Sequence, residues 1–67
     1  MTVTILKIAL GVALVTLDGS FEARLESSNY EGPRELIKKG SSFRALCELY
    51  ESSGELNVNI RQVVGLG

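Results

Sequence analysis

The chain opens with an almost unbroken apolar run, ILKIALGVALVTL at residues 5–17, in which Lys7 is the only charged side chain. Eight of the sixteen residues from 2 to 17 are β-branched, and such side chains favour the pleated surface of a strand over a helix. Because the run is apolar on both faces, we expect it to be covered on both sides. Gly11 marks either a bulge or a turn, so the run forms one strand or two.

The same run is too short for a membrane-spanning helix. A helix over residues 3–17 would rise only about 22 Å, against a hydrocarbon core of roughly 30 Å. Lys7 would lie inside that span, at a cost of about 2.5–3.5 kcal/mol at its centre. A secretion signal also fits poorly, because no cleavage site of small residues follows the run. We therefore expect no membrane association.

A hairpin turn is the strongest local signal in the sequence. Asp18-Gly19 is a dipeptide typical of a type I′ turn, and it lies between two runs that could pair. On its far side apolar residues alternate with charged ones, which predicts a strand with one buried face. The apolar members are Phe21, Ala23 and Leu25, and the charged members are Glu22, Arg24 and Glu26.

Two helical segments are predicted in the middle of the chain. Pro33 suits the first position of a helix that ends before Gly40. Ser41 or Ser42 would then cap a second helix, which Gly54 would end. The evidence for this second helix is an apolar stripe with the spacing i, i+3, i+4 and i+7, formed by Phe43, Leu46, Cys47 and Tyr50.

A last strand is predicted over residues 55–63, where Leu56, Val58 and Ile60 alternate with polar residues. The expected fold is therefore α+β. It consists of a small antiparallel sheet, made of an N-terminal hairpin or meander and the C-terminal strand, packed against one broken helix or two short helices. Residues 1–67 form a single domain.

Size and composition favour association with another chain. A domain of 67 residues buries only about 60% of the surface that its unfolded chain exposes, so its core is marginal. One cysteine forms no internal disulfide, and the absence of histidine removes the common zinc sites. Burial against a protein partner or a second copy would supply the missing stability. The single thiol fits a reducing, cytoplasmic compartment.

The residues offer little for catalysis. Without histidine there is no Ser-His or Cys-His pair, and no glycine motif for phosphate binding is present. Cys47 is interpreted as a small buried hydrophobic residue. We therefore predict a non-enzymatic protein without catalytic residues, metal or cofactor.

The predicted function is a protein-interaction or regulatory module that binds a partner protein or a second copy of itself through a sheet edge and an apolar face. The last strand is the expected edge, since Arg61 is its only edge-blunting charge. The expected contact residues there are Asn57, Asn59 and Arg61.

The alternative function is a small nucleic-acid-binding regulator. Residues 34–44 carry four basic side chains, Arg34, Lys38, Lys39 and Arg44, against one acid, Glu35. The net charge of the whole chain is −1, so any attraction to a polyanion would be local to this segment.

Overall fold

The computed structural model describes residues 1–66, which form five β-strands and no α-helix. The strands are β1 (Thr2–Ala9), β2 (Val12–Leu17), β3 (Phe21–Glu26), β4 (Ser42–Ser52) and β5 (Glu55–Leu66). Two single-turn 3-10 helices, η1 (Ser27–Asn29) and η2 (Arg34–Leu36), lie between β3 and β4. The predicted α+β fold is therefore wrong, and the chain folds as a small all-β domain.

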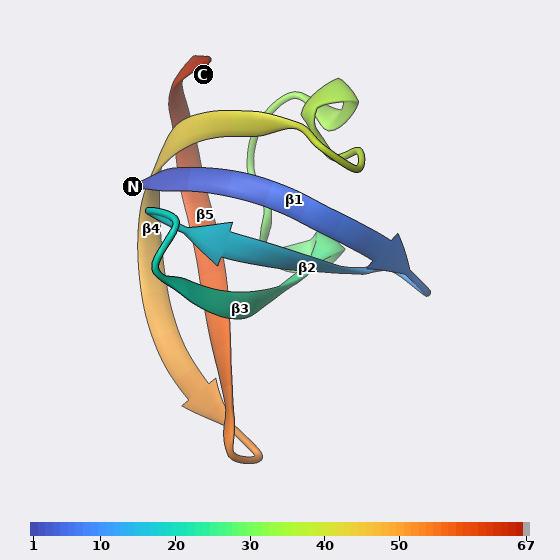
Figure 1. Cartoon of the computed structure of the whole chain (residues 1–67), viewed down its shortest axis with the longest axis vertical. Coiled ribbons are helices and arrows are strands. Elements are labelled where there is room, and N and C mark those ends of the chain that lie inside the picture. Colours follow the sequence, from blue (N-terminus) through green and yellow to red (C-terminus); the bar gives the residue numbers. More distant parts are fainter. Residues whose placement is uncertain (67) are drawn as a thin grey trace.

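The strands close into a barrel in the order β1-β2-β3-β5-β4 (Figure 1). All neighbouring strands are antiparallel except β3 and β5, which run parallel and share the single register pair Arg24–Asn57. The barrel closes where β4 pairs with β1 through residues 42–44. β5 therefore has a neighbouring strand on each side near Asn57.

Each of the three hairpins turns on a residue followed by glycine, and both residues have positive φ. Asp18 and Gly19 have φ of 53° and 67°, and the Ser20 N–H donates to the Leu17 carbonyl across the turn. This confirms the predicted turn. Leu10-Gly11 joins β1 to β2 in the same way, so residues 2–17 form two strands. Ser53-Gly54 joins β4 to β5 and ends a hairpin, not a helix.

The second predicted helix is the strand β4. Its residues alternate between the barrel interior and the outside, with Phe43 and Ala45 fully buried and Arg44 and Leu46 exposed. Residues 43–50 also fit the apolar stripe of a helix. As a strand, however, β4 gains ladder hydrogen bonds from β5 over its whole length and from β1 at its start. Tertiary pairing therefore overrides the local pattern.

The first predicted helix is reduced to the single turn η2. Pro33 precedes it in extended backbone, and Ile37 has already left helical geometry at φ −88° and ψ 80°. Gly40 takes the expected positive φ, but in a turn that leads into β4. None of the helical segments in residues 1–66 has the length and apolar character needed to cross a membrane.

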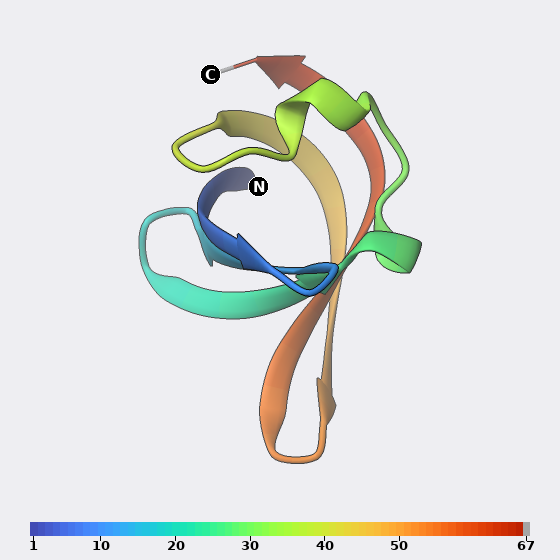
Figure 2. The same ribbon diagram turned by 90° about the vertical axis from the view of Figure 1, so that its right-hand side faces the viewer.

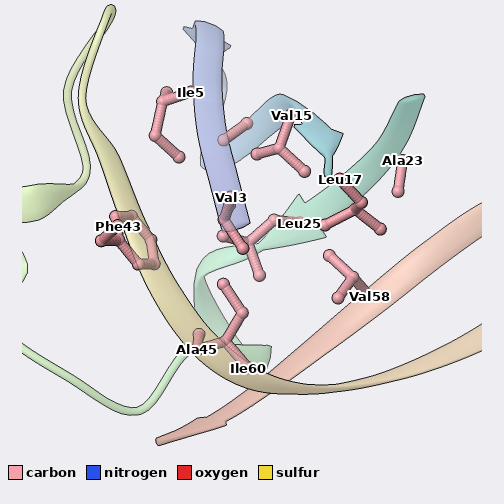
Figure 3. Close-up of a cluster of buried hydrophobic side chains, with 11 residues drawn as sticks. Val3, Ile5, Val15, Leu17, Ala23, Leu25, Phe43, Ala45, Val58 and Ile60 are labelled. Carbon is pink, nitrogen blue, oxygen red and sulfur yellow. The ribbon is translucent and has the colours of Figure 1, made fainter. Parts of the chain in front are cut away.

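The core fills the barrel with side chains from all five strands (Figure 3). The predicted alternation is confirmed at Ala23 and Leu25 of β3 and at Val58 and Ile60 of β5, which are buried. It is wrong at Phe21, which is 39% exposed, and at Asn57, which is buried. The other core residues are Val3, Ile5, Ala13, Val15, Leu17, Phe43 and Ala45. Residues 2–17 therefore supply five of the eleven core residues.

Candidate binding surfaces

The hairpin of β4 and β5 extends as an arm beyond the strands that close the barrel (Figure 2). β4 pairs with β1 only through residues 42–44, and Ala45 adds a backbone contact with Met1. From residue 46 to residue 52, β4 pairs with β5 on one side, and no strand of residues 1–66 pairs with it on the other. We call this seven-residue stretch the free edge.

Hydrogen bonding at the start of the free edge shows which backbone groups are unpaired. Ala45 donates its N–H to the Met1 carbonyl and accepts from the Met1 amino group, both at 2.8 Å. The two register shifts place their extra residues on β5. Along β4, backbone groups that face β5 therefore alternate without interruption with groups that face away from it. Cys47, Leu49 and Glu51 therefore direct N–H and C=O groups outward, like Ala45.

The free edge has only part of the usual protection against strand pairing. Proteins blunt such edges with charged side chains, above all lysine, with proline or with bulges. The free edge contains neither lysine nor proline, and the bulges lie on β5. Two of its apolar side chains are accessible, Leu46 at 55% exposure and Leu49 at 40%. Its charges are Glu48, which lies 3.7 Å from Arg61, and Glu51.

The last strand is not an unpaired edge at Asn57 and Ile60. β5 lies between β4 and β3, and its Ile60 also bridges to Tyr30. Asn57 is buried at 3% exposure, and its Nδ2 donates to the Glu55 carbonyl at 3.0 Å. Asn59 is half-buried and Arg61 is exposed. Asn57 is therefore a structural residue, and the free edge belongs to β4.

The structure separates the four basic residues proposed for polyanion binding. Arg34, Lys38 and Lys39 are exposed on the connection between β3 and β4. Arg44 lies on β4, where its guanidinium covers Gly65 so closely that a Cβ there would lie 2.5 Å from Nη2. Three of the four predicted residues therefore share one segment.

An outer groove crosses β1, β2 and β3 beside the tip of the arm. Lys7, Leu14 and Arg24 are register neighbours on these strands, and Arg24 Nη1 lies 2.7 Å from Glu55 Oε2. Two adjoining hollows of about 240 and 320 Å³ share Leu14, Arg24 and Glu55. No local pattern in the sequence indicates this groove, because its residues come together only when the barrel closes.

The charge of the outer groove is balanced. Its lining contains two basic residues, Lys7 and Arg24, two acidic residues, Glu22 and Glu55, and no aromatic ring. Some small β-barrels bind oligonucleotides on an outer strand face. Such binding relies on cationic grooves and stacked aromatic side chains. The groove of this chain offers neither an excess of positive charge nor a stacking platform.

A second concavity, the end cavity, lies between the β1–β2 hairpin and the connection that follows β3. Its volume is about 190 Å³, and its lining includes Ile8, Tyr30 and Arg34. The Tyr30 hydroxyl donates to the Pro33 carbonyl, and its ring meets Phe43 edge-on at 6.2 Å between centroids. Burial, and secondly the charge of Glu35, raise the pKa of Tyr30.

The side chains assemble no catalytic or metal-binding group in the described part of the chain. No cluster of three or more His, Cys, Asp or Glu residues in positions 1–66 is arranged to hold a metal ion. Cys47 is half-buried, and burial raises the pKa of its thiol. Asp18 raises that pKa further, and the N-terminal ammonium lowers it in part. The thiol is therefore less ionised than an ordinary cysteine.

The chain has no significant match among family models, curated proteins or solved structures. Its function is therefore argued from its surfaces alone. Of these surfaces, the free edge leaves hydrogen-bonding groups without protein partners over the longest stretch of chain.

Proposed function

We propose that the chain is a small interaction module that acts by strand addition at the free edge, with a second copy of itself as the partner. The observation that carries this proposal is the row of outward N–H and C=O groups at Cys47, Leu49 and Glu51. Unpaired backbone of this kind is a template for another strand. The exposed Leu46 and Leu49 add apolar surface beside it.

Two copies of the free edge are complementary to each other when they run antiparallel about a two-fold axis at Leu49. Leu49 then faces Leu49 of the second copy, Cys47 faces Glu51, and Glu48 faces Tyr50. No two like charges are directly opposed, which would otherwise destabilise the pair. All three outward residues lie in hydrogen-bonded positions, so each exchanges both backbone bonds with its counterpart.

The size of the chain supports this partner. A barrel of 67 residues has a small core, and additional burial against a second copy stabilises it. Each new backbone hydrogen bond contributes about 1 kcal/mol net. Two-fold dimers are also the most common form of protein self-association. The module would therefore act by occupancy of this edge rather than by catalysis.

Charge substitutions at Leu49 test the proposal directly. We expect the wild-type chain to be a dimer at tens of micromolar, and we expect Leu49→Lys and Leu49→Glu each to be monomeric. Like charges would face each other across the two-fold axis, and the burial of both leucines would be lost. An equimolar mixture of the two variants should dimerise again, because lysine then faces glutamate. Size exclusion with light scattering measures all four samples.

The matched control is Gln62→Lys, because Gln62 is exposed on β5 and does not lie on the free edge. This variant should remain a dimer. A wild-type chain that stays monomeric at tens of micromolar would refute self-association at this edge. Failure of the mixed variants to dimerise would refute the two-fold register at Leu49.

A second function, binding of a nucleic acid, is supported by one observation. Arg34, Lys38 and Lys39 are exposed on the same connection, close to one another in sequence. The balanced charge of the outer groove limits this binding to that connection. Retention of DNA or RNA that weakens steeply with salt in a filter assay would favour this function.

A further inference from the structure

The end cavity is formed by segments that lie far apart in the sequence. Ile8 and Ala13 come from the β1–β2 hairpin, Leu25 from β3, and Ile37 from the connection that leads to β4. Ala13 and Leu25 are buried core residues, so the floor of the cavity belongs to the packed interior. Ile8, which is 44% exposed, and the exposed Arg34 form part of the lining on the solvent side of the cavity.

The volume of the end cavity limits the size of a ligand. An engineered apolar cavity of about 150 Å³ in another protein binds benzene. The end cavity, at about 190 Å³, therefore accommodates one ring or one branched aliphatic group with a small substituent. Sites for larger ligands usually exceed 300 Å³. A nucleotide is too large for this site.

Arg34 is the only charged residue that lines the end cavity. The ion pairs in residues 1–66 are Arg24–Glu55 and Arg61–Glu48, so no carboxylate lies within ion-pair distance of Arg34. A guanidinium binds a carboxylate through two parallel hydrogen bonds. We infer that the end cavity binds a small monocarboxylate whose apolar part, one ring or one branched chain, fills the space above Ala13 and Leu25.

Titration of the full chain with phenylacetate tests this site, with phenylacetamide as the uncharged ligand of the same shape. Backbone amide chemical shifts report binding at Ala13, Leu25 and Ile37. We expect saturable shifts with phenylacetate, with a dissociation constant on the order of 1 mM, as suits a ligand of this size. Phenylacetamide should bind at least about tenfold more weakly, because it lacks the charge that Arg34 recognises.

Three variants separate recognition of the charge from filling of the cavity. Arg34→Gln should weaken phenylacetate to the level of phenylacetamide and leave phenylacetamide unchanged. Lys38→Gln removes an exposed cation of the same connection that does not line the cavity, and it should change neither ligand. Ile8→Trp fills the exposed mouth and should abolish both, and its dispersed spectrum would show that it is folded.

Equal binding of the two ligands, or equal effects of the Arg34 and Lys38 substitutions, would overturn the inference. Saturation that survives Ile8→Trp would also overturn it, because the ligand would then bind elsewhere. The variants lie outside residues 46–52, so the result for this site is independent of the result for the free edge.

Discussion

Replacement of Phe43 by alanine is expected to leave much of the chain unfolded at 25 °C. Phe43 is fully buried at the seam where β4 pairs with β1, opposite Val3, and its ring also contacts Tyr30 (Figure 3). Removing a buried phenylalanine costs about 3–5 kcal/mol. A chain of 67 residues has a total stability of about 3–10 kcal/mol, at roughly 0.05–0.15 kcal/mol per residue. The loss is therefore a large fraction of the whole.

Thermal and urea unfolding followed by circular dichroism measure this effect. Phe43→Leu is the control, because it keeps most of the apolar volume and should cost only about 1.5 kcal/mol. A change of 1 kcal/mol shifts the Tm of a domain this small by about 4–8 °C. If Phe43→Ala lowered the Tm by only a few degrees, Phe43 would not lie in the core and the barrel would be wrong.

Proline at the two glutamates of the free edge, Glu48 and Glu51, is expected to have opposite effects on stability and on association. Glu48 pairs with Asn59 and directs its N–H toward β5, whereas Glu51 directs its N–H to the free edge. Proline removes the N–H and is tolerated in strands only where that group faces solvent. Glu48→Pro should therefore lower the Tm by about 10–15 °C, for a loss of roughly 2 kcal/mol. Glu51→Pro should keep the Tm of the monomer and abolish the dimer.

The two variants control for each other, since each replaces an exposed glutamate of the same strand with proline. The Tm is measured at a concentration low enough for the wild type to be monomeric, and association is measured by light scattering. Equal losses of Tm in the two variants would show that both N–H groups serve the fold. The assignment of the free edge would then be incorrect.

Local signals in the sequence predicted the first half of the fold well. Asp18-Gly19 can take the two positive φ values that a type I′ turn requires. The alternation after it matches the faces of β3 at Ala23 and Leu25, but Phe21 is exposed. Leu10-Gly11 and Ser53-Gly54 make the same kind of turn but carry weaker signals. Because Ser53-Gly54 also suits a helix end, the hairpin there was missed.

The identity of β4 was beyond the reach of local patterns. Phe43, Ala45, Cys47 and Leu49 form a strand alternation, and Phe43, Leu46, Cys47 and Tyr50 form a helical stripe in the same eight residues. Only long-range pairing with β5 and β1 decides between them. A search for alternation beside Ser53-Gly54 could have indicated the strand.

The position of the predicted binding edge also depended on whether residues 42–52 form a helix or a strand. The expectation of an unpaired sheet edge remains the basis of the proposed function, but the edge moves from the last strand to β4. Asn57 was predicted as a contact residue because it lies among the polar residues that alternate with Leu56, Val58 and Ile60 on the expected edge strand. The structure buries it between β3 and β4. The outer groove and the end cavity combine residues from distant segments, so neither has a signature in the sequence.

Amide hydrogen exchange of the wild-type chain, measured by NMR at a series of protein concentrations, tests the central claim most directly. The amides of Leu46, Glu48 and Tyr50 face β5 and should be protected at every concentration. The amides of Cys47, Leu49 and Glu51 should exchange rapidly in dilute samples and become protected together as concentration rises. Rapid exchange of these three amides even at high concentration, or full protection of them in the dilute monomer, would contradict the account.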